Sequence, residues 1–381
     1  MGLPASSQLA ARQARVRQCL DTLNLDALVV TSAANIRYLS NHRGSSGFLV
    51  LTRDLVHLLV DFRYREAVQM LQRSASACPG LVARDVPASY DEALLLCLGD
   101  IGVAVAGFEA AHVSVARHQW WQRTVEARPL DIAFKPTERA IEEARLIKDA
   151  FEIATLRDAA ARLTSVAESV FEATRAGESE RAVAAAIESA LRHAGYERPS
   201  FDTIVASGPN AALPHHRAGD RVLAEGDLVV LDFGGVLDGY CSDLTRTVSI
   251  GPAGGRTRDV YYAVREAHGR AIEAVAPGRS RFDVDAAARD TLTRHGLGEA
   301  FGHGTGHGLG IEVHEDPRIA RRRPELDVNV ADEAIAAGMV FTIEPGAYLP
   351  GWGGVRIEDD VLVTEQGVEV LTEVTTDLIE I

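Results

Sequence analysis

Cysteine and long hydrophobic runs are both scarce in this 381-residue sequence. Its four cysteines, Cys19, Cys78, Cys97 and Cys241, form no CxxC pair, which excludes a zinc knuckle and a dithiol redox motif. Free thiols are typical of a reducing compartment, so we expect a cytoplasmic protein. No apolar run approaches the roughly 20 residues that cross a bilayer, and the first residues lack the apolar core of a signal peptide. We therefore expect no membrane partner.

Positive charge is also in short supply. The sequence has 39 Lys and Arg against 54 Asp and Glu, a net charge of -15, and the two signs are interspersed. Binding to nucleic acid requires a basic face, so we expect no nucleic-acid partner. Hydrophobic residues make up 46% and charged residues 24% of the chain, which is typical of a soluble globular protein. The length suits two domains.

The first part of the chain alternates between β-rich runs and segments of helical spacing. The β-rich runs are LDALVVT, GFLVLT, VHLLVDF and GVAVAGFE, each bounded by polar or glycine residues. The helical segments are ARQARVRQCLDTLN, DFRYREAVQMLQ and VSVARHQWWQRTV. This pattern predicts a small α/β domain over residues 1–138. We interpret ARPLDIAFKPTER, with its two prolines, as a junction to a second domain over residues 139–381.

The second part predicts helices followed by strands, and the order occurs twice. One long helix is expected over residues 142–175 and another over 180–194, followed by strands. Two more are expected over residues 259–275 and 282–295, the second with Ser280 as N-cap, and a strand-rich last third follows. The expected class of this domain is α+β.

Four carboxylates and one imidazole in this second part have the residue types of a two-metal site. They are Asp232 in LVVLDFGG, Asp243 in YCSDLTRT, His307 in GHGTGHGLG, Glu344 in FTIEPG and Glu358 in GVRIEDD. Burial of so many acids among apolar neighbours is unfavourable without cations. Oxygen ligands with a single imidazole suit Mn²⁺, Co²⁺ or Zn²⁺. We therefore predict two divalent metal ions, with Mn²⁺ as the first choice.

Strand register brings these acids together in two pairs. If Asp238 and Gly239 form a two-residue turn, Asp243 lies opposite Gly234, and Asp232 is its diagonal neighbour on the same face. In the second hairpin a turn centred near Gly351 places Glu344 directly opposite Glu358. For a single acid, a salt-bridged strand residue would be the preferred interpretation. Two matched hairpins with a glycine-flanked histidine favour the metal site.

The segment GHGTGHGLGIEVHE matches neither the GxGxxG nor the HExxH pattern. We interpret its glycines as positions where the backbone passes close to the metals and to substrate. His303, His307 and His314 are expected on one wall, with only one of them a metal ligand. The other two would donate hydrogen bonds to an oxyanion, with a structural histidine as the alternative for each.

Together the segments LDFGG, SDLTRT, GHGLGIEVHE, FTIEPG and GVRIEDD resemble the signature segments of the M24 "pita-bread" metallopeptidases. Within that family the match is to Xaa-Pro aminopeptidases and prolidases. The segments SAANIRYLSNHRGSSGFLVLT and VDFRYREA resemble the creatinase/prolidase N-terminal domain. The resemblance covers nearly the whole chain. It implies an α/β creatinase/prolidase-like domain over residues 1–138 and a pita-bread catalytic domain over residues 139–381.

The resemblance also implies roles for the five ligands. Asp232 would chelate one metal through both oxygens, Asp243 and Glu358 would bridge the two metals, and His307 and Glu344 would complete the coordination of the second. A bridging hydroxide would be the nucleophile. Glu344 would act as general acid and base.

The remaining site residues come from the same resemblance. His303 and His314 would stabilise the tetrahedral intermediate and hold the scissile carbonyl. His215, in GPNAALPHH, matches the substrate-side histidine of the family, whereas the adjacent His216 is given no role. Arg356 would orient the carboxylates of the site.

Arg318 leaves the length of the substrate open. In prolidases an arginine near this position can hold the free carboxylate of a dipeptide. The same residue also occurs in aminopeptidase-type relatives, and a surface arginine is the alternative interpretation. The activity that the resemblance implies first is a Xaa-Pro aminopeptidase acting on peptides with proline at the second position. The alternative is a Xaa-Pro dipeptidase. A catalytically silent pita-bread module and a metal-free creatinase-like amidinohydrolase are disfavoured because all five ligands are present. Relatives are commonly homodimers, so we expect a homodimer.

Overall fold

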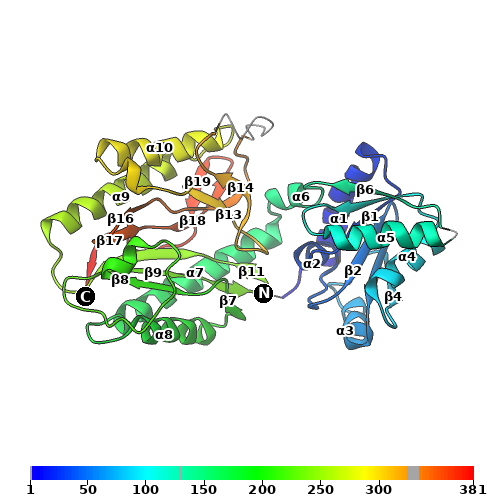
Figure 1. The fold of residues 1–381 in the computed structure, drawn as a ribbon, viewed down its shortest axis with the longest axis horizontal. Helices are drawn as coiled ribbons and strands as arrows, with labels where there is room; N and C mark the ends of the chain where they lie inside the picture. The colour runs from blue at the N-terminus through cyan, green and yellow to red at the C-terminus, as the bar shows by residue number, and fades with distance from the viewer. Residues whose placement is uncertain (1, 129, 324–333) are drawn as a thin grey trace. The chain divides into compact units, whose positions relative to one another are not determined.

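The chain divides into two compact units in a computed structural model that describes residues 2–128, 130–323 and 334–381 (Figure 1). The units are Met1–Arg145 and Leu146–Ile381. The domain boundary expected after residue 138 falls inside the first of them. No helix within the described ranges combines the length and the apolar composition needed to cross a membrane.

The first unit is built on a six-stranded sheet in the order β4-β3-β2-β1-β5-β6. The pairs β1–β5, β3–β4 and β5–β6 are parallel, whereas β1–β2 and β2–β3 are antiparallel. The strands are β1 Ala27–Val30, β2 Phe48–Thr52, β3 Val56–Val60, β4 Leu81–Asp85, β5 Val105–Glu109 and β6 Ala133–Thr137. The helices are α1 Ser6–Thr22, α2 Ala33–Ser40, α3 Phe62–Gln72, α4 Tyr90–Asp100, α5 Val115–Ala127 and α6 Glu142–Leu146. The α/β class expected for this part of the chain is confirmed.

Four elements of this unit, helix α2 among them, were not expected from the sequence. The segment interpreted as a junction contains β6, which pairs in parallel with β5. Pro136 is tolerated there because β6 is an edge strand, where a missing N–H removes no bond of the ladder interior. Strand β4 and helix α4 were also missed. The apolar run of α4 has too little alternation with polar residues to show a helical period.

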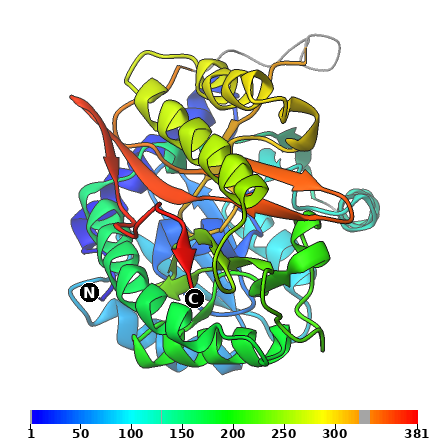
Figure 2. The same cartoon turned by 90° about the vertical axis from the view of Figure 1, so that its left-hand side faces the viewer.

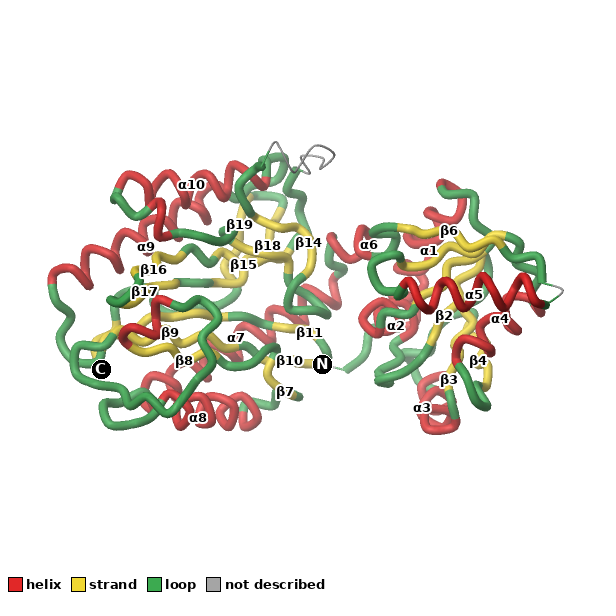
Figure 3. Tube along the Cα trace, viewed as in Figure 1, coloured by secondary structure: helices red, strands yellow, loops and turns green. Residues whose placement is uncertain are grey.

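The second unit contains two sets of helices followed by antiparallel strands (Figure 3). The first set is α7 Ala150–Ala173, α8 Glu180–His193, β7 Arg198–Pro199, β8 Ile204–Ser207, η1 Gly208–Ala212, β9 Leu228–Phe233, β10 Gly235–Leu237, β11 Tyr240–Cys241 and β12 Leu244–Ser249. The second set is α9 Gly255–Ala274, α10 Arg281–Arg294, η2 Gly298–Ala300, β13 Gly306–Gly308, β14 Glu315–Ile319, β15 Val340–Ile343, β16 Gly346–Leu349, β17 Gly353–Arg356, β18 Asp359–Thr364, β19 Gly367–Val370 and β20 Ile379–Glu380. The expected α+β class with a doubled pattern is confirmed.

Helices flank the strands of this unit on two sides. Figure 2 shows the yellow helices α9 and α10 on one side of the strands and the green helices α7 and α8 on the other. One apolar core joins α9 and α10 to β15, β17 and β18, and a second joins α7 and α8 to β8, β9 and β12. The strands that carry the candidate ligands therefore lie between two cores.

The long helix expected over residues 142–175 is wrong, because the structure has two helices there. α6 ends at Leu146 and α7 begins at Ala150. The Asp149 side chain accepts hydrogen bonds from the N–H groups of Phe151 and Glu152, so it caps a new helix. Just before it, the Lys148 N–H donates to the carbonyl of Gly338, and its ammonium pairs with the buried Glu315 at 3.1 Å. A long-range pairing therefore interrupts a helix that local propensity favours.

Candidate metal centre

The first hairpin has the register that the sequence predicts. Asp238 and Gly239 have φ values of 47° and 76°, as a two-residue turn with both φ positive requires. Val236 pairs with Cys241, and Asp232 pairs with Thr245. These pairs bracket the position at which Asp243 lies opposite Gly234, so the two aspartates are diagonal neighbours. A β-carbon on Gly234 would lie 2.0 Å from the carbonyl oxygen of Ser242, so this close approach of the strands requires glycine.

The second hairpin also has the predicted register. Ile343 pairs with Asp359, and Gly346 pairs with Arg356. Glu344 is therefore opposite Glu358, and the turn contains Gly351 with a φ of 76°. The two hairpins meet at an isolated antiparallel bridge between Thr245 and Glu358, where the Thr245 hydroxyl donates to Glu358 Oε2 at 2.6 Å. The four acids thus come from two hairpins that this bridge joins.

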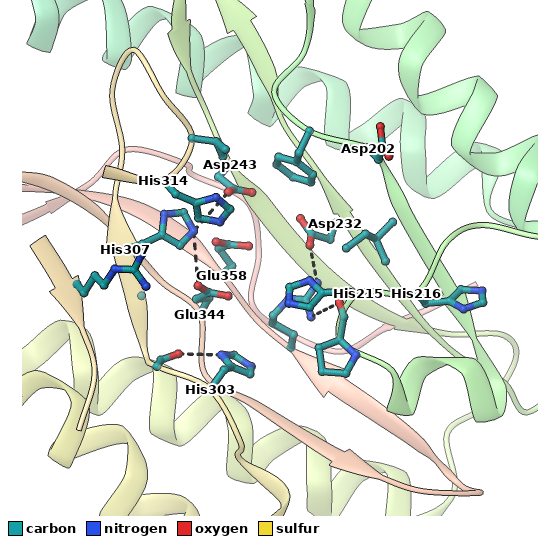
Figure 4. Close-up of a pocket in the computed structure, with 18 of the residues that line it drawn as sticks. Asp202, His215, His216, Asp232, Asp243, His303, His307, His314, Glu344 and Glu358 are labelled. Atoms are coloured by element: carbon teal, nitrogen blue, oxygen red, sulfur yellow. Dashed lines mark hydrogen bonds and ion pairs between the residues drawn. The ribbon is translucent and has the colours of Figure 1, made fainter. Parts of the chain in front are cut away.

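The donor atoms of the five residues converge on one pocket (Figure 4). One donor atom each from Asp243, His307 and Glu358 lies within 4.8 Å of the others. His307 Nε2 is 3.6 Å from Glu344 Oε1 and 3.9 Å from Asp243 Oδ2. The opposite nitrogen, Nδ1, faces the carbonyl of Gly308 at 3.1 Å, which fixes the tautomer with its Nε2 lone pair directed into the site.

Two buried oxygens in this pocket support cation binding. Asp232 Oδ1 and Asp243 Oδ1 are buried and find no hydrogen-bond donor among the described residues. Buried polar atoms normally have a partner, and a divalent cation provides one. The residues present therefore fit a site for divalent metal ions.

Burial and mutual repulsion give these carboxyl groups unusual acidities. Burial raises the pKa of Glu358 and Asp243 well above the usual range, and neighbouring carboxylates raise it further. Burial raises the pKa of Glu344 to about 7, with Arg356 opposing the shift. Burial lowers the pKa of His307 to about 4, so its imidazole is neutral at pH 7 and is available as a ligand.

These shifts predict how metal binding depends on pH. The Glu344 carboxyl has an ordinary pKa of 4.5 and a pKa of about 7 in the fold. In the metal-free protein this carboxyl group therefore stabilises the fold at low pH. Its contribution to the free energy of unfolding is lost as pH rises from about 4.5 through about 7. Metal must displace its proton below about pH 7, so Mn²⁺ affinity should weaken up to about tenfold for each pH unit below it.

We expect the rise in melting temperature that Mn²⁺ produces to grow as pH increases across this window. Melting curves of chelator-treated protein with and without Mn²⁺ measure it at each pH. An Mn²⁺ effect of equal size at both ends of the window would contradict Glu344 as a ligand.

Arg356 connects several groups of the site, as the sequence predicts. Its guanidinium donates to Asp232 Oδ2 at 2.5 Å, to the Thr245 hydroxyl at 3.2 Å and to the Tyr348 hydroxyl at 2.9 Å. The side chain is buried. The Arg356 guanidinium therefore orients the Asp232 carboxylate. It also holds the hydroxyls of Thr245 and Tyr348, which were not predicted from the sequence.

Tyr348 favours the structural one of the two alternatives for His303. His303 Nδ1 faces the carbonyl of Gly304 at 2.8 Å, so it carries a proton, and Nε2 lies 2.9 Å from the Tyr348 hydroxyl. Because Arg356 donates to Tyr348, the tyrosine O–H is free to donate to His303 Nε2. Burial lowers the pKa of His303 to about 4. Neutral His303 therefore has no N–H left for an oxyanion, and the geometry favours His314 as that donor.

The other predicted substrate residues line a cavity of about 710 Å³ beside the five ligands. His215, His314 and Arg318 are all exposed to it. Arg318 pairs with His307 across β13 and β14, so both side chains lie on one face. The rings of His307 and His314 are 4.3 Å apart. The cavity thus brings together every residue that the sequence suggested for the site.

Two glycines of the histidine segment allow neighbouring strands to approach each other closely. A β-carbon on Gly306 would lie 1.8 Å from the carbonyl oxygen of Thr342, and one on Gly308 would lie 2.1 Å from that of Asp316. These glycines therefore let β13 approach its neighbouring strands, β15 and β14. The spacing of the sheet by itself requires glycine at these two positions.

Sequence reasoning missed three further polar residues of the site. Tyr348 and Thr245 hold Arg356 and Glu358, and the buried Asp360 accepts the N–H of Asp243 at 3.1 Å. Thr245 and Asp360 belong to segments that were quoted for their ligands, and Tyr348 lies two residues after such a segment. The period-2 pattern indicates which residues share a face, and it gives no information on contacts between different sheets.

Four converging carboxylates, a neutral imidazole and an adjoining cavity define the site of a metallohydrolase. Comparison with known proteins gives the family. Residues 154–365 match the family model of metallopeptidase family M24, and residues 12–147 match that of the creatinase/prolidase N-terminal domain. The chain belongs to metallopeptidase family M24, and it is a metallo-exopeptidase with the two-domain arrangement of the prolidase group.

Relatives and solved structures match almost end to end. A Bacillus subtilis protein described as the uncharacterized peptidase YqhT is 34% identical over 96% of this chain and 98% of its own. The Xaa-Pro dipeptidase of Pyrococcus horikoshii is 32% identical over 96% and 97%. The structure of a Xaa-Pro dipeptidase from Bacillus anthracis has a TM-score of 0.89 and 34% identity, covering 98% and 100%. That of an X-Pro aminopeptidase from Thermotoga maritima has a TM-score of 0.83 and 32% identity, covering 95% and 99%.

Proposed function

We propose that this protein hydrolyses the peptide bond between an N-terminal residue and a following proline. The observation that carries the proposal is the complete five-residue ligand set beside a cavity lined by two exposed histidines and an exposed arginine. The names of the relatives support the choice of bond. An amide before proline has no N–H, so a site that holds the carbonyl and the substrate ends is suited to it.

The chain's own residues would divide the reaction between them. Bound divalent ions, with Mn²⁺ as our first choice and Co²⁺ or Zn²⁺ as alternatives, would supply a water molecule acidified for attack. Glu344, which lies in the cavity 3.6 Å from His307 Nε2, would accept a proton and pass it to the leaving nitrogen. His314 would donate to the carbonyl oxygen, and His215 would contact the substrate. Arg356 and Tyr348 would hold the carboxylates and His303 in place.

Two substrate lengths remain as candidates, and Arg318 favours the shorter. The aminopeptidase was the first choice from the sequence. Arg318 lies beside His307 in register, and no carboxylate of the described residues pairs with it. A guanidinium next to a metal ligand suits a carboxylate one residue away from the scissile bond, as in a Xaa-Pro dipeptide.

The test of this proposal is a paired assay of a Xaa-Pro dipeptide and a Xaa-Pro-Ala tripeptide after chelation and Mn²⁺ addition. Cleavage of either peptide that requires metal supports the proposed bond specificity. Cleavage of the dipeptide alone identifies a dipeptidase, and cleavage of the tripeptide identifies an aminopeptidase. No cleavage of either with metal bound would overturn the proposal.

Arg318 itself gives a sharper prediction. Arg318→Ala should raise the KM for the dipeptide by roughly 10- to 100-fold, because a charged carboxylate loses its hydrogen-bonded partner. The KM for the C-terminal amide of the Xaa-Pro-Ala tripeptide, which has no terminal carboxylate, should stay within about threefold of the wild-type value. Equal losses for both substrates would show that Arg318 does not recognise a carboxylate.

We further propose that the protein is a cytoplasmic homodimer. Size-exclusion chromatography with light scattering tests whether it is a dimer.

A further inference from the structure

The segment that presents His215 is attached on both sides of that residue. Before it, the carbonyl of Pro214 accepts a hydrogen bond from Arg356 Nη1 at 3.4 Å. After it, His216 Nε2 lies 2.8 Å from Glu180 Oε2. In Figure 4 His215 lies beside Asp232, and His216 points away from the four carboxylates. His216 therefore faces an anchor outside the metal site, although the sequence suggested no role for it.

Glu180 is a fully buried carboxylate that ties several segments together. It is the first residue of α8, and its exposed fraction is 0%. Its acceptors receive five hydrogen bonds, from Ser207 N at 2.9 Å, Ser207 Oγ at 2.7 Å, Asn210 Nδ2 at 2.9 Å, His216 Nε2 at 2.8 Å and Gly219 N at 3.2 Å. Ser207 and Asn210 precede His215 in the chain, and His216 and Gly219 follow it.

The five donors keep this carboxylate charged without a lysine or arginine ion pair among the described residues. Burial alone would raise the pKa of Glu180, but hydrogen bonds from Ser207, Asn210 and His216 outweigh it and lower the pKa to about 2. The position of Glu180 at the start of α8 favours its negative charge. The Glu180 carboxylate is therefore a fixed hydrogen-bond acceptor that is negatively charged near neutral pH.

We propose that Glu180 and His216 form a positioning pair that holds His215 at the wall of the cavity. His216 is the only side chain of residues 213–218 for which the described contacts show a hydrogen bond to a carboxylate. Because His216 is held, the backbone at the adjacent His215 is restricted to one main orientation. Misplacement of a substrate contact by about 1 Å can lower the rate about 100-fold. The inference rests on the proposed function, because the contact of His215 with substrate is part of it.

Kinetics of His216 variants test the pair. His216→Ala should lower kcat/KM roughly 10- to 100-fold. His216→Gln should stay within about threefold of wild type, because the glutamine amide nitrogen reaches the position of Nε2 and donates to Glu180. The matched control is His295→Ala, which removes a 2.8 Å His295–Glu266 pair at the surface; surface pairs contribute little, so its kinetics should not change.

A double variant separates positioning from general damage to the fold. If His216 acts through His215, then His216→Ala should cost less than about twofold in a His215→Ala background. Full loss in that background, or no loss from His216→Ala in the wild type, would overturn the proposal.

Limited trypsin digestion tests the same pair without any peptidase assay. Arg217 is exposed and directly follows His216. Cleavage after Arg217, followed by mass spectrometry, should be at least about tenfold faster in His216→Ala than in wild type or His216→Gln. Equal rates in all three would contradict the anchoring. If wild type cleaves no proline peptide, the proposed function fails, and the digestion still decides whether the pair holds the segment.

Discussion

Asp243→Ala is expected to remove bound metal and peptidase activity together. Asp243 is 4% exposed, and its carboxylate lies within 4.8 Å of the donor atoms of His307 and Glu358. If Asp243 bridges two metal ions, as the family resemblance implies, both ions would lose a ligand. The fall in kcat/KM should exceed the roughly 10- to 100-fold loss that follows removal of a group hydrogen-bonded to a metal ligand. Metal analysis of the purified variant and peptide kinetics with added Mn²⁺ measure the two effects.

The matched control for this variant is Asp377→Ala in the same unit. Asp377 forms an exposed ion pair with Arg265 at 2.8 Å, and such pairs contribute about 0–1 kcal/mol. The control should retain its metal and its activity. Without metal, Asp243→Ala should melt at least as high as the chelated wild type, because it removes a buried carboxyl group whose Oδ1 has no hydrogen-bond donor among the described residues. Two bound metals and normal turnover in Asp243→Ala would show that the ligand assignment is wrong.

Glu344→Gln should reduce turnover strongly and leave the fold intact. Its carboxylate is 18% exposed to the cavity and 3.6 Å from His307 Nε2, and its backbone N–H donates to the Thr305 carbonyl at 2.7 Å. This position beside the imidazole and at the cavity suits a group that transfers a proton to a bound substrate. Loss of a general acid and base costs about 100- to 10,000-fold in kcat. Glutamine has the same shape and retains an oxygen, so the melting temperature of the metal-free protein should be unchanged or higher.

Saturation kinetics and melting curves separate these two effects. The control is Glu369→Gln, which makes the same chemical change in an exposed pair with Arg157 at 2.6 Å. Its kcat should match that of the wild type. A Glu344→Gln variant that keeps kcat within about threefold, with metal bound, would remove Glu344 from the proton-transfer role.

Local register let the sequence predict most of the metal centre. A two-residue turn fixes which residues oppose each other, so the sequence alone places Asp243 opposite Gly234 and Glu344 opposite Glu358. The structure confirms both registers. The resemblance to a known family then supplied roles for His215 and Arg318 that no spacing rule gives.

Contacts between distant segments account for the errors. The predicted long helix breaks because Lys148 pairs with Glu315, 167 positions away. His303 has no free N–H because Tyr348, 45 residues later, faces its Nε2. Strand β6 was missed because the two prolines of its segment suggested a junction, and only the position at the edge of a sheet permits the strand.

The sequence by itself determined the ligand types, their two hairpins and the division into an α/β part and an α+β part. These features depend on neighbouring residues, whose period and turn chemistry are readable along the chain. The tertiary structure alone decided how the hairpins meet at Thr245 and Glu358, how Arg356 connects Asp232 to Tyr348, and how Glu180 holds the segment of His215. The reason is physical: a buried polar group needs a partner, and packing, rather than sequence distance, selects which one it finds.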